Sequence, residues 1–217
     1  MPDPIAGLLP PGVSLPLYPP APHCNTRGLT ALGEHMIKGM IERGMLVEID
    51  HMSVKAAGRA LDLLEAARYP GVISSHSWTD PHYFERVYAL GGMINQYGHD
   101  AEHFVAEWAR TEPPRQQHGI AGYGYGLDVN GMGRLPGPRA ANAADPVTYP
   151  FTSFDGGVSF DRLRTGERVR DVNTDGVANY GLVPDWIEDM RIIAGDEIVR
   201  DMAARASACA AGSRRCS

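Results

Sequence analysis

Apolar residues recur along the chain in two alternating patterns, one with helical spacing and one of short continuous runs. Residues 30–43 carry apolar side chains at helical spacing and end at Gly44, which favours a helix C-terminus. The run MLVEI at 45–49 follows and predicts a strand. Residues 57–64 again follow helical spacing, and this stretch stops before the turn at 69–71.

The same order of strand and helix repeats further along the chain. The runs at 71–76 (GVISSH) and 91–97 (GGMINQY) predict strands, and residues 82–90 and 100–110 predict helices. A glycine-rich run, HGIAGYGYGLD at 118–128, predicts the last strand. Strands that alternate with helices favour a parallel sheet whose strand C-termini lie on one side. The predicted fold class is therefore α/β.

The two ends of the chain differ from this pattern. Residues 1–25 are rich in proline and predict an extended segment, so the folded unit is expected at 26–217. Residues beyond Pro184 predict two helices separated by Gly195, with Asp196 as N-cap. We expect these two helices to pack against the outside of the sheet.

Residues 129–180 interrupt the alternation with many Gly, Pro, Asn and Asp residues. A long polar excursion after a strand end typically covers a site, so we expect a lid-like insertion here. Within it, Asp155-Gly156 is a turn signal and predicts a β-hairpin.

Composition and charge indicate which binding partners and which cellular compartment to expect for this protein. The formal net charge is −6 and the isoelectric point is about 5.7, which argues against nucleic acid or an anionic membrane as partner. No unbroken apolar stretch reaches the length of about 18 residues that spans a bilayer, and the N-terminus lacks the basic start of a signal peptide. Three scattered cysteines form no disulfide framework, so we expect a cytoplasmic protein.

Two histidines and one aspartate follow predicted strands at regular spacing. His51 and His76 are one strand–helix unit apart, and Asp128 follows about two units later. Because parallel strand ends face the same side, the three side chains are expected to converge. Two imidazoles and a carboxylate form a ligand set for a divalent metal, above all Zn²⁺. Two alternatives remain: the histidines could be hydrogen-bonded structural residues, and Asp128 could cap the Asn130-Gly131 turn.

These residues also carry a resemblance to a known family. Residues 24–53 (CNTRGLTALGEHMIKGMIERGMLVEIDHMS) and 69–78 (YPGVISSHSW) resemble the second half of the membrane (renal) dipeptidase family, in the metal-dependent amidohydrolase superfamily. The glycine-rich strand before Asp128 resembles the last strand of that family. The sequence NYGLVPDWIEDMRIIAGDEIV at 179–199 resembles the C-terminal helices of bacterial members.

The resemblance implies a (β/α)₈ barrel of TIM type with two zinc ions per complete site, which hydrolyses dipeptides or similar small amides. By position, His51 and His76 would bind one zinc, and Asp128 would act as the acid/base on the last strand. Family members hold the substrate carboxylate with an arginine soon after the Ser-His-Ser strand, and Arg86 lies in that region.

Part of the family pattern is absent. None of the eight histidines is followed two residues later by aspartate, as on the first strand of the family, and no bridging carboxylate is apparent. We therefore expect a partial barrel of about the last four strands with C-terminal helices, in a chain truncated from a longer enzyme. Such a chain would hold at most one zinc well. It would self-associate through its open barrel edges.

Two other functions are consistent with parts of the sequence. The first is a non-catalytic remnant or binding module that keeps the amidohydrolase fold. The second is a cofactor-binding α/β domain that uses GYGYG at 122–126 as a phosphate loop, although no helix is predicted directly after it.

Overall fold

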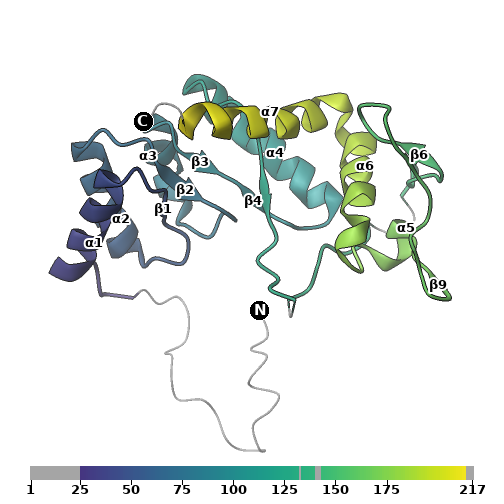
Figure 1. Cartoon of the computed structure of the whole chain (residues 1–217), viewed down its shortest axis with the longest axis horizontal. Helices are drawn as coiled ribbons and strands as arrows, with labels where there is room; N and C mark the ends of the chain where they lie inside the picture. The colour runs from purple at the N-terminus through teal and green to yellow at the C-terminus, as the bar shows by residue number, and fades with distance from the viewer. Residues whose placement is uncertain (1–24, 132, 140–142, 214–217) are drawn as a thin grey trace, which may run out of the picture.

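The computed structural model describes residues 25–131, 133–139 and 143–213, so nearly all of the predicted extended segment at 1–25 lies outside the described residues. The described chain is a mixed α/β structure (Figure 1). Its parallel strands are β1 (Val47–Glu48), β2 (Val72–Ser74), β3 (Met93–Ile94), β4 (Gln96–Tyr97) and β5 (Tyr125–Gly126). Its longer helices are α1 (Ala31–Glu42), α2 (Val54–Ala66), α3 (Phe84–Ala89), α4 (Ala101–Gln117), α6 (Val183–Ala194) and α7 (Asp196–Ser213).

The parallel strands form two short sheets that adjoin at Asn95. Strands β1, β2 and β3 pair in that order, and β4 pairs with β5. Asn95 lies between β3 and β4 and donates its backbone N–H to the Ser74 carbonyl at 2.8 Å. The predicted α/β class and parallel pairing are confirmed, but the described residues show no barrel, so the partial barrel stays a prediction. There β1 has no strand on its outer side, and the expected self-association through such an edge stays a prediction.

The two sheets position their helices around two separate hydrophobic cores. In Figure 1, α1, α2 and α3 lie at the end of the molecule that holds β1 to β3. They bury the first core, which includes Ile37, Val47, Leu61, Leu64, Val72 and Val87. Helix α1 begins after Thr30, whose hydroxyl accepts from the Gly33 N–H at 3.1 Å, as expected for an N-cap.

The second core joins α4, α6 and α7 to β5. Trp186 of α6 is buried and packs edge-on against Phe104 of α4 at 5.1 Å and against Tyr125 of β5 at 5.2 Å between ring centroids. The C-terminal helices thus reach the sheet through Trp186, but α6 packs mainly on α4, and α7 packs mainly on α6. The prediction that they lie directly on the outside of the sheet is only partly correct.

Two element boundaries differ from the predictions. Helix α4 was predicted to end at residue 110 but continues to Gln117 through Pro113 and Pro114. Burial of Thr111 and Arg115 on this last part provides tertiary packing that outweighs the helix-breaking tendency of proline. Asp196 is the first residue of α7 rather than its N-cap, and its carboxylate pairs with Arg191 and Arg200.

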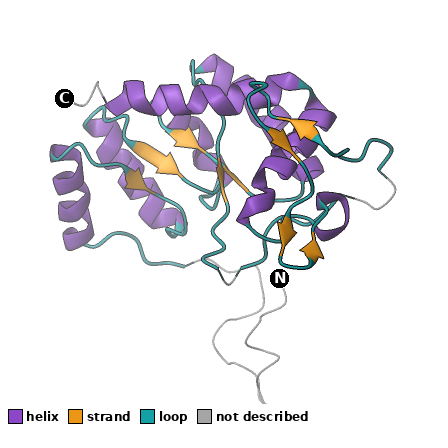
Figure 2. Ribbon diagram, turned by 45° about the vertical axis from the view of Figure 1, so that its right-hand side comes forward, coloured by secondary structure: helices purple, strands orange, loops and turns teal. Residues whose placement is uncertain are grey.

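The insertion at 129–180 contains two hairpins. Strands β6 (Phe151–Thr152) and β7 (Ser159–Phe160) are antiparallel around Asp155-Gly156, as predicted. A second hairpin, β8 (Arg164–Thr165) with β9 (Arg168–Val169), was not predicted. Its turn at Gly166, with φ of 60°, is a signal that the sequence offered. In Figures 1 and 2 both hairpins lie at the end of the molecule away from β1 to β3.

No helix within the described residues combines the length and apolar character needed to cross a membrane.

Asp201 of α7 joins the C-terminal helix to the rest of the chain. Its Oδ2 accepts from the Trp108 indole N–H and forms an ion pair with Arg115, both at 2.8 Å, and its carbonyl accepts from the Tyr123 N–H at 3.2 Å. Arg115 is buried, so loss of its carboxylate partner would leave a charge in the protein interior.

We predict that Asp201→Ala lowers the free energy of unfolding by about 3 kcal/mol. Urea unfolding followed by circular dichroism measures the change. Asp196→Ala on the same helix is the control, because its exposed ion pairs should contribute less than about 1 kcal/mol. Equal effects of the two substitutions would contradict a specific role for Asp201.

Candidate metal centre

His51, His76 and Asp128 meet on the side of the sheet where the parallel strands end. His51 follows β1, His76 follows β2 and Asp128 follows β5, each within three residues of the strand. The two Nε2 atoms are 2.8 Å apart, and Asp128 Oδ2 lies 3.7 Å from the Nε2 of His76 and 3.9 Å from that of His51. The structure therefore brings together the three residues that the spacing of the sequence placed on one face.

The donor set of this group fits a divalent metal ion. One ligand atom from each of the three residues lies within 4.8 Å of the others, and within the described chain this is the only such group of three or more His, Cys, Asp or Glu residues. Both imidazoles present Nε2 to the same point, and a carboxylate oxygen lies beside them. Imidazole nitrogens are typical zinc ligands, and a carboxylate beside the ion can either bind it or act as the acid/base for a metal-bound water.

Three residues in or next to this group have positive φ angles, in the left-handed region of backbone conformation. His51 has φ of 60°, Ser77 of 55° and Asp128 of 45°. This conformation is uncommon for residues other than glycine and tends to cluster at functional sites. The surrounding contacts must therefore hold each of these turns in place.

Asp50 is the main such contact, and we did not single it out from the sequence. Its side chain is almost fully buried and its Oδ2 accepts from the His76 backbone N–H at 2.8 Å. The same oxygen lies 3.1 Å from His76 Nδ1, while Oδ1 accepts from the Ser74 hydroxyl and from the Trp78 N–H. An outer carboxylate of this kind fixes the orientation of a metal-binding histidine, leaving Nε2 free for the ion.

A second acidic residue, Glu48, ties the same two strand ends together. Its carboxylate accepts from the Asp50 N–H at 2.9 Å and from the Ser75 N–H at 3.1 Å. Ser75 in turn places its hydroxyl 2.8 Å from His76 Nδ1. The signal in the sequence was the alternation Glu-Ile-Asp at the end of an apolar run, which places both carboxylates on one face of the strand.

Gly126 explains the glycine-rich last strand. A Cβ atom at this position would lie 2.2 Å from the Ser75 carbonyl oxygen and 2.9 Å from His76 Cβ. Only glycine allows β5 to approach the His76 turn this closely and so to deliver Asp128 to the group. Gly126 thus serves packing, and in the described residues no helix begins between β5 and α5 (Val172–Asp175), so the phosphate-loop hypothesis gains no support.

Asp128 itself uses one oxygen for its own loop and directs the other at the histidines. Asn130 donates its side-chain amide to Asp128 Oδ1 at 3.1 Å, and Oδ2 is the oxygen that lies near both Nε2 atoms. The contact within the Asn130-Gly131 turn is therefore compatible with a role in the group.

Arg86 is not brought into the group. Its guanidinium on α3 donates to Glu65 at 2.6 Å and to Asp62 at 2.8 Å, both on α2. These partners explain its position as a surface ion pair between two helices. The prediction that it binds a substrate carboxylate gains no support from this placement and stays untested.

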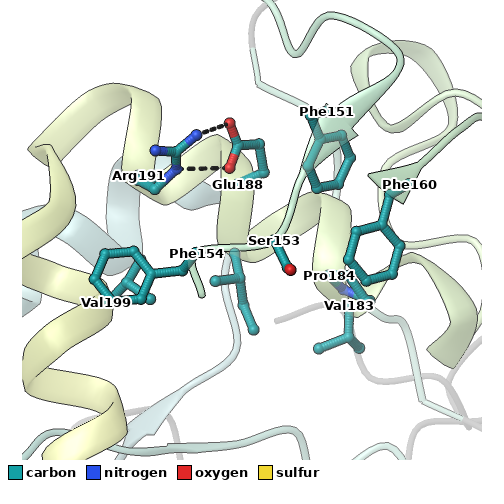
Figure 3. Close-up of a pocket in the computed structure, with 10 residues that line it drawn as sticks. Phe151, Ser153, Phe154, Phe160, Val183, Pro184, Glu188, Arg191 and Val199 are labelled. Atoms are coloured by element: carbon teal, nitrogen blue, oxygen red, sulfur yellow. Dashed lines mark hydrogen bonds and ion pairs between the residues drawn. The ribbon is translucent and has the colours of Figure 1, made fainter. Parts of the chain in front are cut away.

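The hairpin of the insertion borders a different cavity. A pocket of about 220 Å³ lies between β6–β7 and helices α6 and α7, with Phe151, Phe154, Phe160 and Val199 among its lining side chains (Figure 3). Glu188 and Arg191 form a two-fold ion pair at its edge. None of the three clustered residues lines this pocket. The β6–β7 hairpin thus packs on α6 and α7, and the lid role expected for residues 129–180 stays a prediction.

Comparison with known proteins supports the class of site that the geometry defines. A family model described as membrane dipeptidase (peptidase family M19) matches residues 18–82, under a third of the chain. The matched segment includes His51 and His76 and ends before Asp128. No curated protein and no solved structure matches the chain. The resemblance to the membrane dipeptidase family is thus confirmed over that segment.

We predict that Asp50→Asn lowers the affinity for zinc by about 10- to 100-fold, the range typical of outer carboxylate partners. The side-chain amide would place an NH₂ donor against a backbone N–H that now donates to Asp50. The turn at His76 would therefore shift. Isothermal titration with zinc measures the change. Asp62→Asn is the matched control, because it removes the same charge from the exposed face of α2. Equal zinc affinity in both variants would exclude a positioning role for Asp50.

Proposed function

We propose that this protein is a zinc-dependent hydrolase of dipeptides or similar small amides. The observation that carries the proposal is the arrangement of His51 and His76, whose Nε2 atoms face the same point beside the Asp128 carboxylate. The family match supports it, because the matched segment contains both histidines. A hydrolase of this family also requires the metal for which the donor set is suited.

The three residues differ in exposure, and this divides their roles. The His76 side chain is only 11% exposed and is held from behind by Asp50 and Ser75, so it would be the fixed inner ligand. His51 and Asp128 are 55% and 40% exposed and border the solvent side, from which a substrate can approach. His51 would complete the pair of nitrogen ligands.

Asp128 is suited to move a proton. When bound, zinc supplies a Lewis acid for the amide carbonyl and lowers the pKa of an attacking water. Asp128 Oδ2 faces the point between the imidazoles, where it can accept the proton of that water. The same carboxyl can then donate the proton to the leaving amine, as a general acid.

One observation favours a second candidate function, a binding module that retains the metal but not the reaction. The described residues contain one group able to share an ion, and Asp128 supplies its single carboxylate, while Asp50 is already engaged behind His76. A chain with one zinc could bind small amides without cleaving them. Zinc binding is common to both candidates, and hydrolysis separates them.

We predict that the chain binds one zinc ion, and that His51→Ala and His76→Ala each weaken binding more than about 100-fold, beyond the effect of an outer partner. Equilibrium dialysis with metal analysis gives the stoichiometry. His82→Ala is the matched control, because its side chain is 57% exposed, close to that of His51, and contacts Asp80 and Tyr83 instead of the metal centre. Zinc binding that survives both histidine substitutions would rule out this site.

We further predict that Asp128→Asn lowers the rate of dipeptide hydrolysis by about 10²- to 10⁴-fold, the usual contribution of a general acid/base. Release of free amino acid from the zinc-loaded chain measures the rate, and a chelator should abolish it. Asp161→Asn, on the exposed part of the insertion, is the control and should leave the rate unchanged. A chain that binds zinc but cleaves no dipeptide would favour the binding module.

A further inference from the structure

Trp78 places a flat apolar surface directly beside the candidate metal centre. Its side chain belongs to the large hydrophobic residues left exposed, at 43%. The indole lies 5.1 Å from the His51 ring between centroids, tilted by 31°, and Tyr97 meets it edge-on at 6.3 Å. The indole thus contacts two protein rings while part of its surface stays open to solvent.

The backbone turn that carries this ring is held by the same carboxylate that holds the metal-binding turn. Asp50 Oδ1 accepts from the Trp78 backbone N–H at 3.0 Å, while Asp50 Oδ2 accepts from that of His76. Ser77, between them, accepts from the Tyr97 N–H at 3.2 Å. A ring held on a rigid turn loses little conformational entropy when it contacts a ligand, which favours a role in recognition over that of a loose surface residue.

We propose that Trp78 is a specificity-determining residue that stacks on a flat apolar side chain, above all an aromatic one, next to the amide bond held at the metal centre. The inference rests on the proposed function and names the class of substrate for the same site. Aromatic stacking and the apolar area it covers favour a ligand with a ring over one without it, by about tenfold.

A second apolar surface could bind the same ring and must be separated from the first. The pocket between the β6–β7 hairpin and helices α6 and α7 exposes Phe154, at 42% almost as accessible as Trp78 (Figure 3). It includes none of the residues of the metal centre. The aromatic ring of a ligand that binds the metal would therefore contact Trp78. An aromatic ligand that does not bind the metal would be free to occupy the pocket instead.

Two hydroxamates test the inference on the full zinc-loaded chain. Acetohydroxamate and phenylacetohydroxamate bind a metal through the same two oxygens and differ only in the phenyl ring, and neither carries the dipeptide bond. Isothermal titration should give a dissociation constant about tenfold lower for phenylacetohydroxamate. Trp78→Ala should remove this preference, whereas Phe154→Ala, the control of matched exposure, should preserve it. Trp78→Phe keeps a ring and should retain most of it, and this variant serves if Trp78→Ala does not fold.

The outcomes separate the inference from the proposed function. Equal affinity of the two hydroxamates for the zinc-loaded chain, or a preference lost in Phe154→Ala but kept in Trp78→Ala, overturns the inference alone. Loss of zinc binding in Trp78→Ala and Trp78→Phe alike would show that the ring supports His51 and does not select substrates, which also overturns it. A chain that binds no zinc contradicts the proposed function and the inference together.

Discussion

A buried carboxylate at Asp50 holds together the part of the molecule on which the rest depends. An ionised group inside a protein is costly unless its oxygens accept hydrogen bonds. Here the donors all come from the end of β2 and the residues after it, whereas Asp50 itself follows β1. The need to satisfy this carboxylate therefore locks two strand ends together and sets the direction of the His76 imidazole. These hydrogen bonds hold the two strand ends in place, and the left-handed backbone conformation of His51 persists because of them.

Short strands make such contacts more important than they would be in a larger sheet. The parallel strands are two or three residues long, so few ladder hydrogen bonds define their relative positions. Side-chain contacts beyond the strands take over that role: Glu48 and Asp50 join β1 to β2, and the missing Cβ of Gly126 lets β5 approach β2. The candidate metal centre is thus held together mainly by side-chain contacts at the ends of very short strands.

Features with a local signature were predictable from the sequence, and features decided by distant contacts were not. The helix after Thr30, the hairpin at Asp155-Gly156 and the convergence of His51, His76 and Asp128 all follow from spacing or turn chemistry. By contrast, the continuation of α4 past two prolines depends on what buries Arg115, and the partners of Asp50 lie 24 to 28 residues away. The placement of the hairpin against α6 likewise depends on packing that no local pattern encodes.

The link between Trp108 and Asp201 has a consequence for how the chain reaches this structure. The two residues are 93 positions apart, and Asp201 also forms an ion pair with Arg115. Contacts that close such long loops form late, because the entropy of the intervening chain must be lost first. During synthesis, the first core and the two histidines next to it can assemble before α7 is available to contact α4. The half of the molecule that carries the histidines would then become ordered before the half that buries Trp186.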